Sequence, residues 1–359
     1  MRYKKHLFAL TLALVSVGFW NFVLPPAGQA GVVSEPVLES QDETLKLWKS
    51  STAEGKDKLF KGDLAQGETL LNAALSASRQ LKDRDLTATS LSNLAQLERA
   101  KGDLIASEKY SRQSLHLLSP GISGSGRGLA YAIELTNLAA TLKEQGQFVE
   151  AASLYQAASA IFVQVQGADS IEVATVNHNL AALYQKFHKH KEAIDSEAKA
   201  VAIYEQKLGT SSPDLAIALG TMAESYRELG EGVKARTLYE RSLAIMRGNF
   251  GERHPAVATA MDNLAGLLAR QGKLREAEGL ELKALATFKQ TLGLDHPDVA
   301  ICLDNLAYLY IAQGRLDLAK ATSEDALSIT TRKLGEEHPL SLEMKGRLDS
   351  IVEMLKLSD

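Results

Sequence analysis

The sequence contains a single cysteine, Cys302, so it cannot form an intramolecular disulfide. A folded form must therefore rely on packing for its stability. The chain also lacks a block rich in lysine and arginine, and its 40 Lys and Arg stand against 44 Asp and Glu. This balance argues against nucleic-acid binding through a basic surface. Beyond residue 30 we find no run apolar enough to span a membrane, so we expect no stable membrane insertion of that part.

The first 30 residues have the three-part layout of a secretory signal. A cationic start precedes an apolar run over residues 7–24, and the small residues Gly28 and Ala30 then suit a signal peptidase. We expect cleavage after Ala30 and export to the periplasm, the extracellular space or a thylakoid-type lumen. The alternative is an uncleaved anchor, because the run is just long enough to span a bilayer. Cleavage would leave 37 Lys and Arg against 44 Asp and Glu, a net charge of −7.

After this segment, residues 31–42 are polar with one proline, which indicates a flexible tether. The rest of the chain repeats itself. A motif that reads NLA or a close variant starts at Asn93, Asn137, Asn179, Thr221, Asn263 and Asn305, with one step of 44 residues and four of 42. Each motif lies in an apolar-periodic stretch that ends at a turn glycine, replaced once by His188, and a second periodic stretch follows. This order predicts stacked helix pairs.

The boundaries between repeats are equally regular. Glycines stand 42 residues apart from Gly167 to Gly335, and three residues after each comes a serine or histidine. Proline follows four of these five residues, as expected at the first turn of a helix. His254, His296 and His338 occupy such positions. We therefore interpret them as boundary residues and not as ligands of a shared metal ion.

The pattern resembles the tetratricopeptide repeat family, and specifically its kinesin-light-chain-like branch with a 42-residue repeat. The segments DNLAGLLARQGKLREAEGLELKALATFKQTLGLDHPDVA (262–300) and DNLAYLYIAQGRLDLAKATSEDALSITTRKLGEEHPLS (304–341) carry the resemblance. It implies an all-α, right-handed superhelical solenoid of about seven helix pairs. We expect two repeats over residues 43–118, a Gly/Ser-rich joint at 119–128, five repeats over 129–337 and a capping helix and tail over 338–359.

The asparagines of the NLA motifs are candidates for a binding site. Asparagine is unfavourable inside a helix, so a compensating interaction is expected. The resemblance implies that Asn93, Asn137, Asn179, Asn263 and Asn305 line a concave groove and clamp the backbone of an extended peptide. An amide suits this task because it both donates and accepts a hydrogen bond. The alternative is that these amides join neighbouring repeats.

Charged residues are expected beside the asparagines in the same groove. Four cations lie toward its N-terminal half and two acids toward the other end, namely Arg99, Lys143, Lys186 and Arg227 against Asp262 and Asp304. Such polarity could orient a bound segment. The alternative is an ordinary solvated helix face.

Evidence for catalysis is weak. The segment PGISGSGRG at 120–128 has the glycine spacing of a phosphate-binding loop, but Arg127 and Gly128 replace its lysine and Ser/Thr. His188 and His190 could contact a metal ion, although a zinc site normally needs three or four protein ligands. We therefore expect a non-enzymatic adaptor without a cofactor, which binds a protein or an extended peptide. A structural component of an envelope complex is the alternative, and a metal-dependent hydrolase is a remote third.

Overall fold

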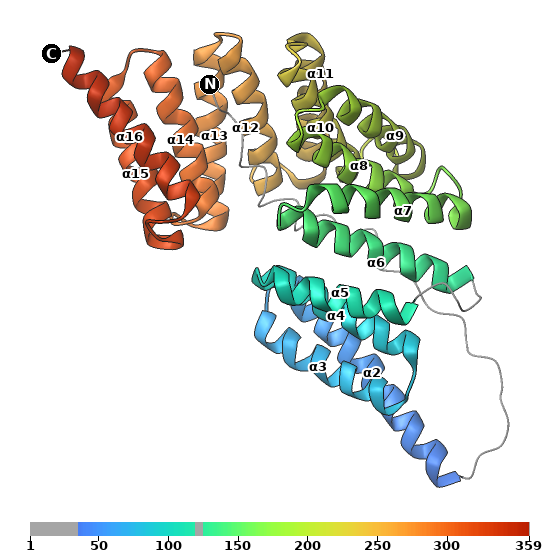
Figure 1. Ribbon diagram of the computed structural model, residues 1–359. Coiled ribbons are helices and arrows are strands. Elements are labelled where there is room, and N and C mark those ends of the chain that lie inside the picture. Colours follow the sequence, from blue (N-terminus) through green and yellow to red (C-terminus); the bar gives the residue numbers. More distant parts are fainter. Residues whose placement is uncertain (1–34, 119–124, 359) are drawn as a thin grey trace. The chain divides into compact units, whose positions relative to one another are not determined.

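The computed structural model describes residues 35–118 and 125–358 of the protein (Figure 1). The expected signal peptide and its cleavage site lie outside the described residues. Within them, the secondary structure consists of 15 helices and no strands. These helices form seven pairs and a final single helix, α16 (Pro339–Ser358). The prediction of an all-α solenoid of about seven helix pairs with a C-terminal capping helix is thus confirmed.

Each pair consists of a first and a second helix joined by a short turn. The first helices are α2 (Glu35–Phe60), α4 (Arg84–Lys101), α6 (Ser125–Glu144), α8 (Ile171–Lys186), α10 (Pro213–Glu228), α12 (Pro255–Arg270) and α14 (Pro297–Ala312). The second helices are α3 (Leu64–Gln80), α5 (Leu104–Leu118), α7 (Phe148–Gln166), α9 (His190–Leu208), α11 (Gly232–Phe250), α13 (Leu274–Leu292) and α15 (Leu316–Leu334).

Two expected boundaries differ from the structure. Helix α2 begins at Glu35, so residues 35–42 are helical and do not belong to a flexible tether. Pro36 is compatible with this because proline is tolerated in the first turn of a helix. Helix α6 begins at Ser125, so the last four residues of the expected joint at 119–128 are also helical. The preceding part of that joint, residues 119–124, lies outside the described residues.

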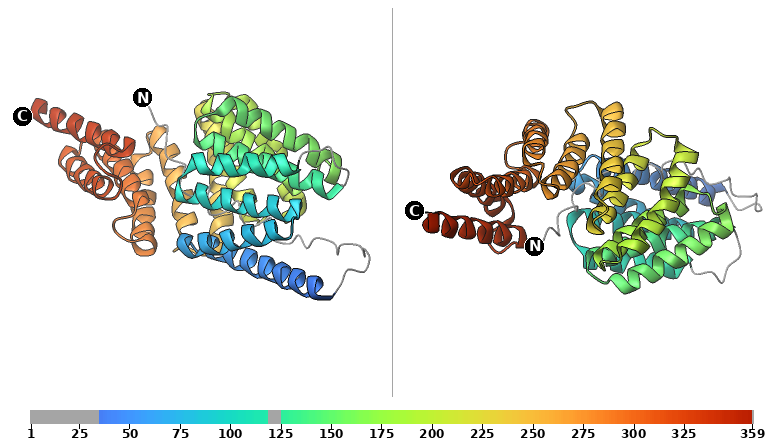
Figure 2. Two further views of the ribbon diagram at one scale, coloured as in Figure 1. Left: turned by 60° about the horizontal axis from the view of Figure 1, so that its bottom comes forward. Right: turned by 90° about the horizontal axis from the view of Figure 1, so that it is seen from above.

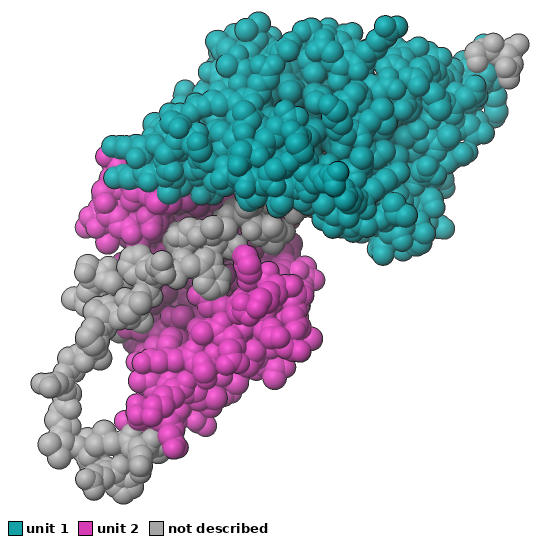
Figure 3. Space-filling model, turned by 180° about the vertical axis from the view of Figure 1, so that it is seen from behind, with its two compact units in different colours: residues 1–21, 188–359 teal, residues 22–187 magenta. Residues whose placement is uncertain are grey.

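The described chain divides into two compact units, residues 35–187 and residues 188–358 (Figure 3). The division falls in the turn of the fourth pair, between α8 and α9. Inside each unit, a second helix packs against its own first helix and against the first helix of the next repeat, except that α9 packs against α10 alone because α8 belongs to the other unit (Figure 2). Small residues such as Ala151, Ala235 and Ala319 are fully buried and allow this close approach.

Local sequence explains where the helices end and begin. Gly272, in the turn between α12 and α13, has a φ of +76°, which glycine adopts without steric cost. His188 takes the same place after α8 with a φ of +61°. At the repeat boundaries, Nδ1 of His254, His296 and His338 accepts a hydrogen bond from the backbone N–H two residues later, at 3.2 Å in each case. These three histidines are therefore helix N-caps, as serine is at the other boundaries.

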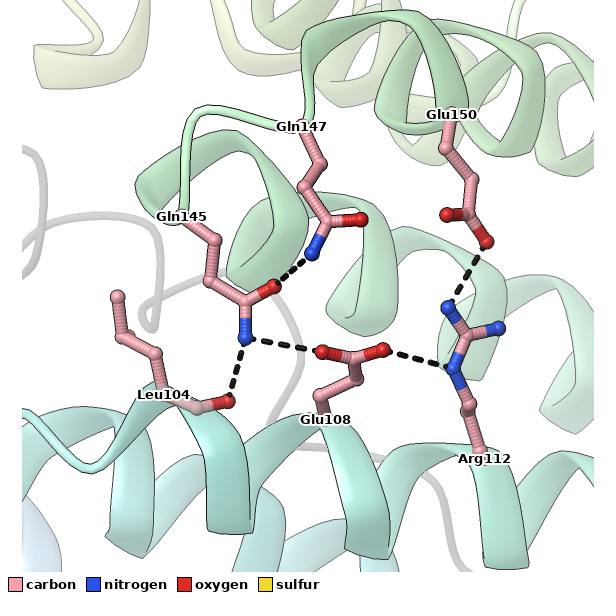
Figure 4. A network of polar contacts seen from close by, with 6 residues as sticks. All are labelled: Leu104, Glu108, Arg112, Gln145, Gln147 and Glu150. Atoms are coloured by element: carbon pink, nitrogen blue, oxygen red, sulfur yellow. Dashed lines mark hydrogen bonds and ion pairs between the residues drawn. The ribbon is translucent and has the colours of Figure 1, made fainter.

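Polar side chains at the helix ends join the second repeat to the third (Figure 4). Gln145 Nε2 donates to the Leu104 carbonyl at 3.0 Å and to Glu108 at 2.9 Å. Arg112 donates to both Glu108 and Glu150, at 2.9 Å each. The sixth and seventh repeats reproduce this arrangement. There, Gln313 and Arg315 donate to Glu278, at 2.9 Å each.

Helix α7 is an exception to the expectation that no run beyond residue 30 is apolar enough to span a membrane. Its 19 residues are long and apolar enough, by those measures alone, to cross a membrane. The helix is nevertheless the second member of the third pair. Its buried residues Ala151, Tyr155, Ala158 and Phe162 pack in that repeat. The high hydropathy reflects many alanines and valines together with one acidic residue, Glu150.

Candidate functional site

The first helices line the inner face of each unit. Helices α2, α4, α6 and α8 contact one another in succession, and so do α10, α12 and α14 in the other unit. In a curved stack of helix pairs, the more closely spaced helices lie on the concave side. We use the term inner face for this side of each unit. All the candidate site residues from the sequence lie on first helices.

Two of the five asparagines join neighbouring repeats. Asn137 Nδ2 donates to Ser92 Oγ at 3.3 Å, and Asn305 Nδ2 donates to Asp262 Oδ1 at 2.7 Å. In both cases the acceptor directly precedes the asparagine position of the previous repeat. Arg347 occupies the asparagine position in α16 and donates to Asp304 at 2.5 Å in the same way. This position thus connects consecutive repeats, which was the alternative to a peptide clamp.

Within the part of the chain that the structure describes, the other three asparagines make no such contact. Asn93 is 4% exposed, and its Nδ2 has no hydrogen-bond partner among the described residues. Asn179 is buried in α8, and Asn263 is half-buried in α12. The position that would accept from Asn263 is Gly220, which has no side chain. The five asparagines therefore do not act as one uniform ladder.

The expected cations of the unit formed by residues 35–187 influence one another electrostatically. Arg99, Lys143 and Lys186 come from α4, α6 and α8, three consecutive first helices. Burial lowers the pKa of Lys143 to about 8, and the positive charges of Arg99 and Lys186 act in the same direction, although Glu144 opposes them. These effects of Arg99 and Lys186 on Lys143 require that the three cations lie near one another. The inner face of this unit thus carries a basic group.

A buried tyrosine hydroxyl lies close to this basic group. Tyr155 of α7 is fully buried, and its hydroxyl has no hydrogen-bond partner among the described residues. Burial raises the pKa of this phenol, while the charge of Arg99 acts to lower it. An unpartnered buried donor is costly. Asn93 Nδ2 and the Tyr155 hydroxyl are thus among the buried polar atoms without a hydrogen-bond partner in the unit that carries the basic group.

In the unit formed by residues 188–358, the expected site charges are engaged by neighbouring side chains. Arg227 is almost buried and forms ion pairs with Glu224 and Glu228. Tyr239 donates to Glu224 at 2.8 Å. Asp262 and Asp304 accept the hydrogen bonds from the next repeat described above. These charges are thus used inside the stack, which reduces the charge difference expected along the inner face.

The sequence analysis missed Glu281 on α13. Its carboxyl group, the Asp262 carboxyl group and the Cys302 thiol lie within 4.8 Å of one another. Burial and the neighbouring Asp262 raise the pKa of Glu281 well above its usual value. A signal for this residue was present. The same second-helix position carries a polar residue in six repeats, namely Ser111, Tyr155, Glu197, Tyr239, Glu281 and Ser323.

A family model for the tetratricopeptide repeat matches residues 54–118, 131–206, 214–290 and 282–332. The chain belongs to the tetratricopeptide repeat family. No curated protein matches the sequence. The family assignment agrees with the helix pairs described above.

Several solved structures share the fold of this tetratricopeptide repeat protein. A putative kinesin light chain from Podosopora anserina is 24% identical over 59% of this chain and 98% of its own, with a TM-score of 0.50. Aspartyl phosphate phosphatase F from Bacillus subtilis is 13% identical over 85% and 74%, with a TM-score of 0.63. A Rap protein complexed with competence and sporulation factor is 17% identical over 88% and 87%, with a TM-score of 0.58. At these identities the likeness shows the fold alone.

The histidine pair gains no further metal ligand. The rings of His188 and His190 lie 6.1 Å apart in this tetratricopeptide repeat protein. Among the described residues, neither belongs to a group of three or more side chains positioned to share a metal ion. The structure therefore adds no support for the hydrolase hypothesis.

Proposed function

We propose that this protein is a non-enzymatic scaffold that binds an extended segment of a partner protein on the inner face of residues 35–187. The basic group of Arg99, Lys143 and Lys186 supports this proposal most directly, together with the unpartnered amide of Asn93 on the same helix as Arg99. These groups could donate hydrogen bonds to backbone carbonyls or to an acidic side chain. The Rap complex named above supports the proposal by analogy of fold only.

A second candidate function is a structural component that acts through its outer faces. The contacts from Asn137 to Ser92 and from Asn305 to Asp262 favour it, because they assign a packing role to two asparagines. For either function we also propose export from the cytoplasm, since residues 1–30 have the layout of a signal peptide.

A peptide display library selected on the purified chain tests the scaffold proposal. We expect an enriched peptide to bind at least tenfold more weakly to a variant with Asn93→Ala, Arg99→Ala and Lys143→Ala, because three hydrogen-bonding contacts of about 0.5–1.5 kcal/mol each are lost. Lys109→Ala is the matched control, because Lys109 is an exposed cation on the second helix α5 of the same unit. Equal affinity of the triple variant and the control would reject this site. Failure to select any peptide would favour the structural function.

A further inference from the structure

Asp262 and Glu281 form a pair of acids between the two helices of the sixth repeat, next to the seventh repeat. Glu281 is buried and Asp262 is half-buried. Asp262 lies on α12 and Glu281 on α13, and Cys302 of α14 completes the cluster within 4.8 Å. Glu281 and Cys302 are each 1% exposed. Two ionised carboxylates at this separation and burial would repel each other strongly. The contact therefore requires that at least one acid be protonated.

The hydrogen bonds indicate which acid carries the proton. Burial raises the pKa of Asp262, but a hydrogen bond with Glu281 and the one that Asn305 Nδ2 donates at 2.7 Å both favour its ionised form. Cys302 Sγ donates to Glu281 Oε2 at 3.1 Å. The hydrogen bond with Asp262 favours the protonated form of Glu281, because a neutral Glu281 can donate to a charged Asp262. The arrangement thus corresponds to a carboxylic acid beside a carboxylate.

In the part of the chain that the structure describes, no cation close to the two carboxyl groups neutralises them in place of this proton. Arg227 on α10 acts on Asp262 in favour of ionisation, and Asp298 on α14 acts against it. Lys289 on α13 acts on the Cys302 thiol. Among the described residues, no lysine, arginine or histidine forms an ion pair with Asp262 or Glu281.

We infer that Asp262 and Glu281 share one proton that holds α12 and α13 of the sixth repeat together beside Cys302 of the seventh, and that losing it lets α13 move away from α12 and from Cys302 on α14. The direction in which the stability of this contact changes with pH follows from proton linkage. A carboxyl group whose pKa is raised by folding binds its proton more tightly in the closed contact than in the open one. Its stabilising contribution is full below the ordinary glutamate pKa. The contribution is lost as the pH rises toward the raised value.

Cys302 provides a probe of this contact, because it is the chain's only cysteine and is buried against Glu281. A maleimide can modify the thiol only when α13 and α14 separate. The labelling rate of the full chain should be measured from pH 5 to pH 9. Dividing it by the rate for denatured protein at the same pH removes the intrinsic pH dependence of the thiol. We expect the corrected rate to rise with pH, by up to tenfold per pH unit, because one proton is released.

Glu281→Gln is the informative variant, since a glutamine can still donate to Asp262 but cannot ionise. Its corrected rate should be independent of pH and lower than that of the wild type at neutral pH. Amide hydrogen exchange of α12–α14 provides a second measurement, with α4 and α5 of the other unit as an internal reference. A wild-type rate as flat as that of the variant would overturn the inference. Slower wild-type labelling on addition of Zn²⁺ would also overturn it, because the three groups would then be metal ligands.

Discussion

Two contacts between repeats use the same four positions with different chemistry. Between the second and third repeats these positions are Ser92, Ser111, Glu134 and Asn137. Between the sixth and seventh they are Asp262, Glu281, Cys302 and Asn305. In both contacts the asparagine donates to the residue on the preceding first helix. The comparison teaches that repeat register decides where a polar contact forms, whereas the residue types decide what it does.

The two contacts differ in the hydrogen-bond partners and in the charges of their acidic side chains. Glu134 is 1% exposed, and its Oε1 has no hydrogen-bond partner among the described residues. Its Oε2 accepts from Asn137 at 3.4 Å. Burial raises the pKa of Glu134, while the neighbouring Ser92, Ser111 and Asn137 and the charge of Arg99 act in the opposite direction. The later contact contains two acids that bond to each other. The first contact thus leaves one carboxylate oxygen without a hydrogen-bond partner among the described residues, whereas the second uses its polar groups internally.

The largest effect is expected at the C-terminal end of the stack. Arg347→Ala removes a cation that forms an ion pair with Asp304, whose side chain is only 13% exposed. We expect the free energy of opening of α14–α16 to fall by about 2 kcal/mol, measured by amide hydrogen exchange. Arg332→Ala is the control, because its ion pair with Asp295 is exposed and should contribute under about 1 kcal/mol. Equal effects of the two variants would contradict a packing role at the asparagine position.

Comparing Asn305→Ala with Asn263→Ala distinguishes an asparagine that bonds to the neighbouring repeat from one that does not. Asn305→Ala removes a donor to half-buried Asp262, so we expect a loss of about 1–2 kcal/mol in hydrogen-exchange protection of α12–α14. Asn263→Ala should change stability by less than about 0.5 kcal/mol, because Gly220 offers it no side-chain partner and alanine favours the helix. Similar losses in both variants would show that all the asparagines support the stack.

Replacing either of the two buried tyrosines at the shared second-helix position with phenylalanine should change stability, but in opposite directions. Tyr239→Phe removes a hydrogen bond to Glu224 and should destabilise its unit by about 1 kcal/mol. Tyr155→Phe removes a hydroxyl without a partner among the described residues and should stabilise its unit by up to about 1 kcal/mol. Thermal unfolding with segment-resolved hydrogen exchange measures both. Destabilisation by Tyr155→Phe would show that its hydroxyl is already bonded.

The smallest effect concerns the pH dependence of ligand binding. The pKa of Lys143 is lowered to about 8, so this residue loses its positive charge as the pH rises through that value. We expect an acidic peptide selected on the protein to bind about twofold more weakly at pH 9 than at pH 7, which corresponds to about 0.5 kcal/mol for one partly screened charge. Lys143→Arg should abolish the change. Calorimetric titration at both pH values measures it, and an unchanged pH dependence in that variant would exclude Lys143.

The repeat architecture could be predicted from the sequence because its determinants are local and recur in register. Turn glycines, boundary prolines and buried alanines each act within one or two turns of helix. Their spacing therefore predicted the helix pairs and the capping helix. The start of α2 was missed because a polar segment with an early proline fits both a tether and a first helical turn.

The roles of the polar side chains depended on neighbours one repeat away. Asn137, Asn263 and Asn305 share one motif, but the residue 43 or 45 positions earlier, which is serine, glycine or aspartate, decides whether the amide has a partner. Arg227 and Lys143 are both cations beside that motif, yet only Arg227 is neutralised by ion pairs. The sequence by itself thus determined the repeat and its register, whereas only the tertiary structure decided which polar groups are used in packing. The physical reason is that hydrogen bonds and ion pairs depend on distances of a few ångströms between separate helices.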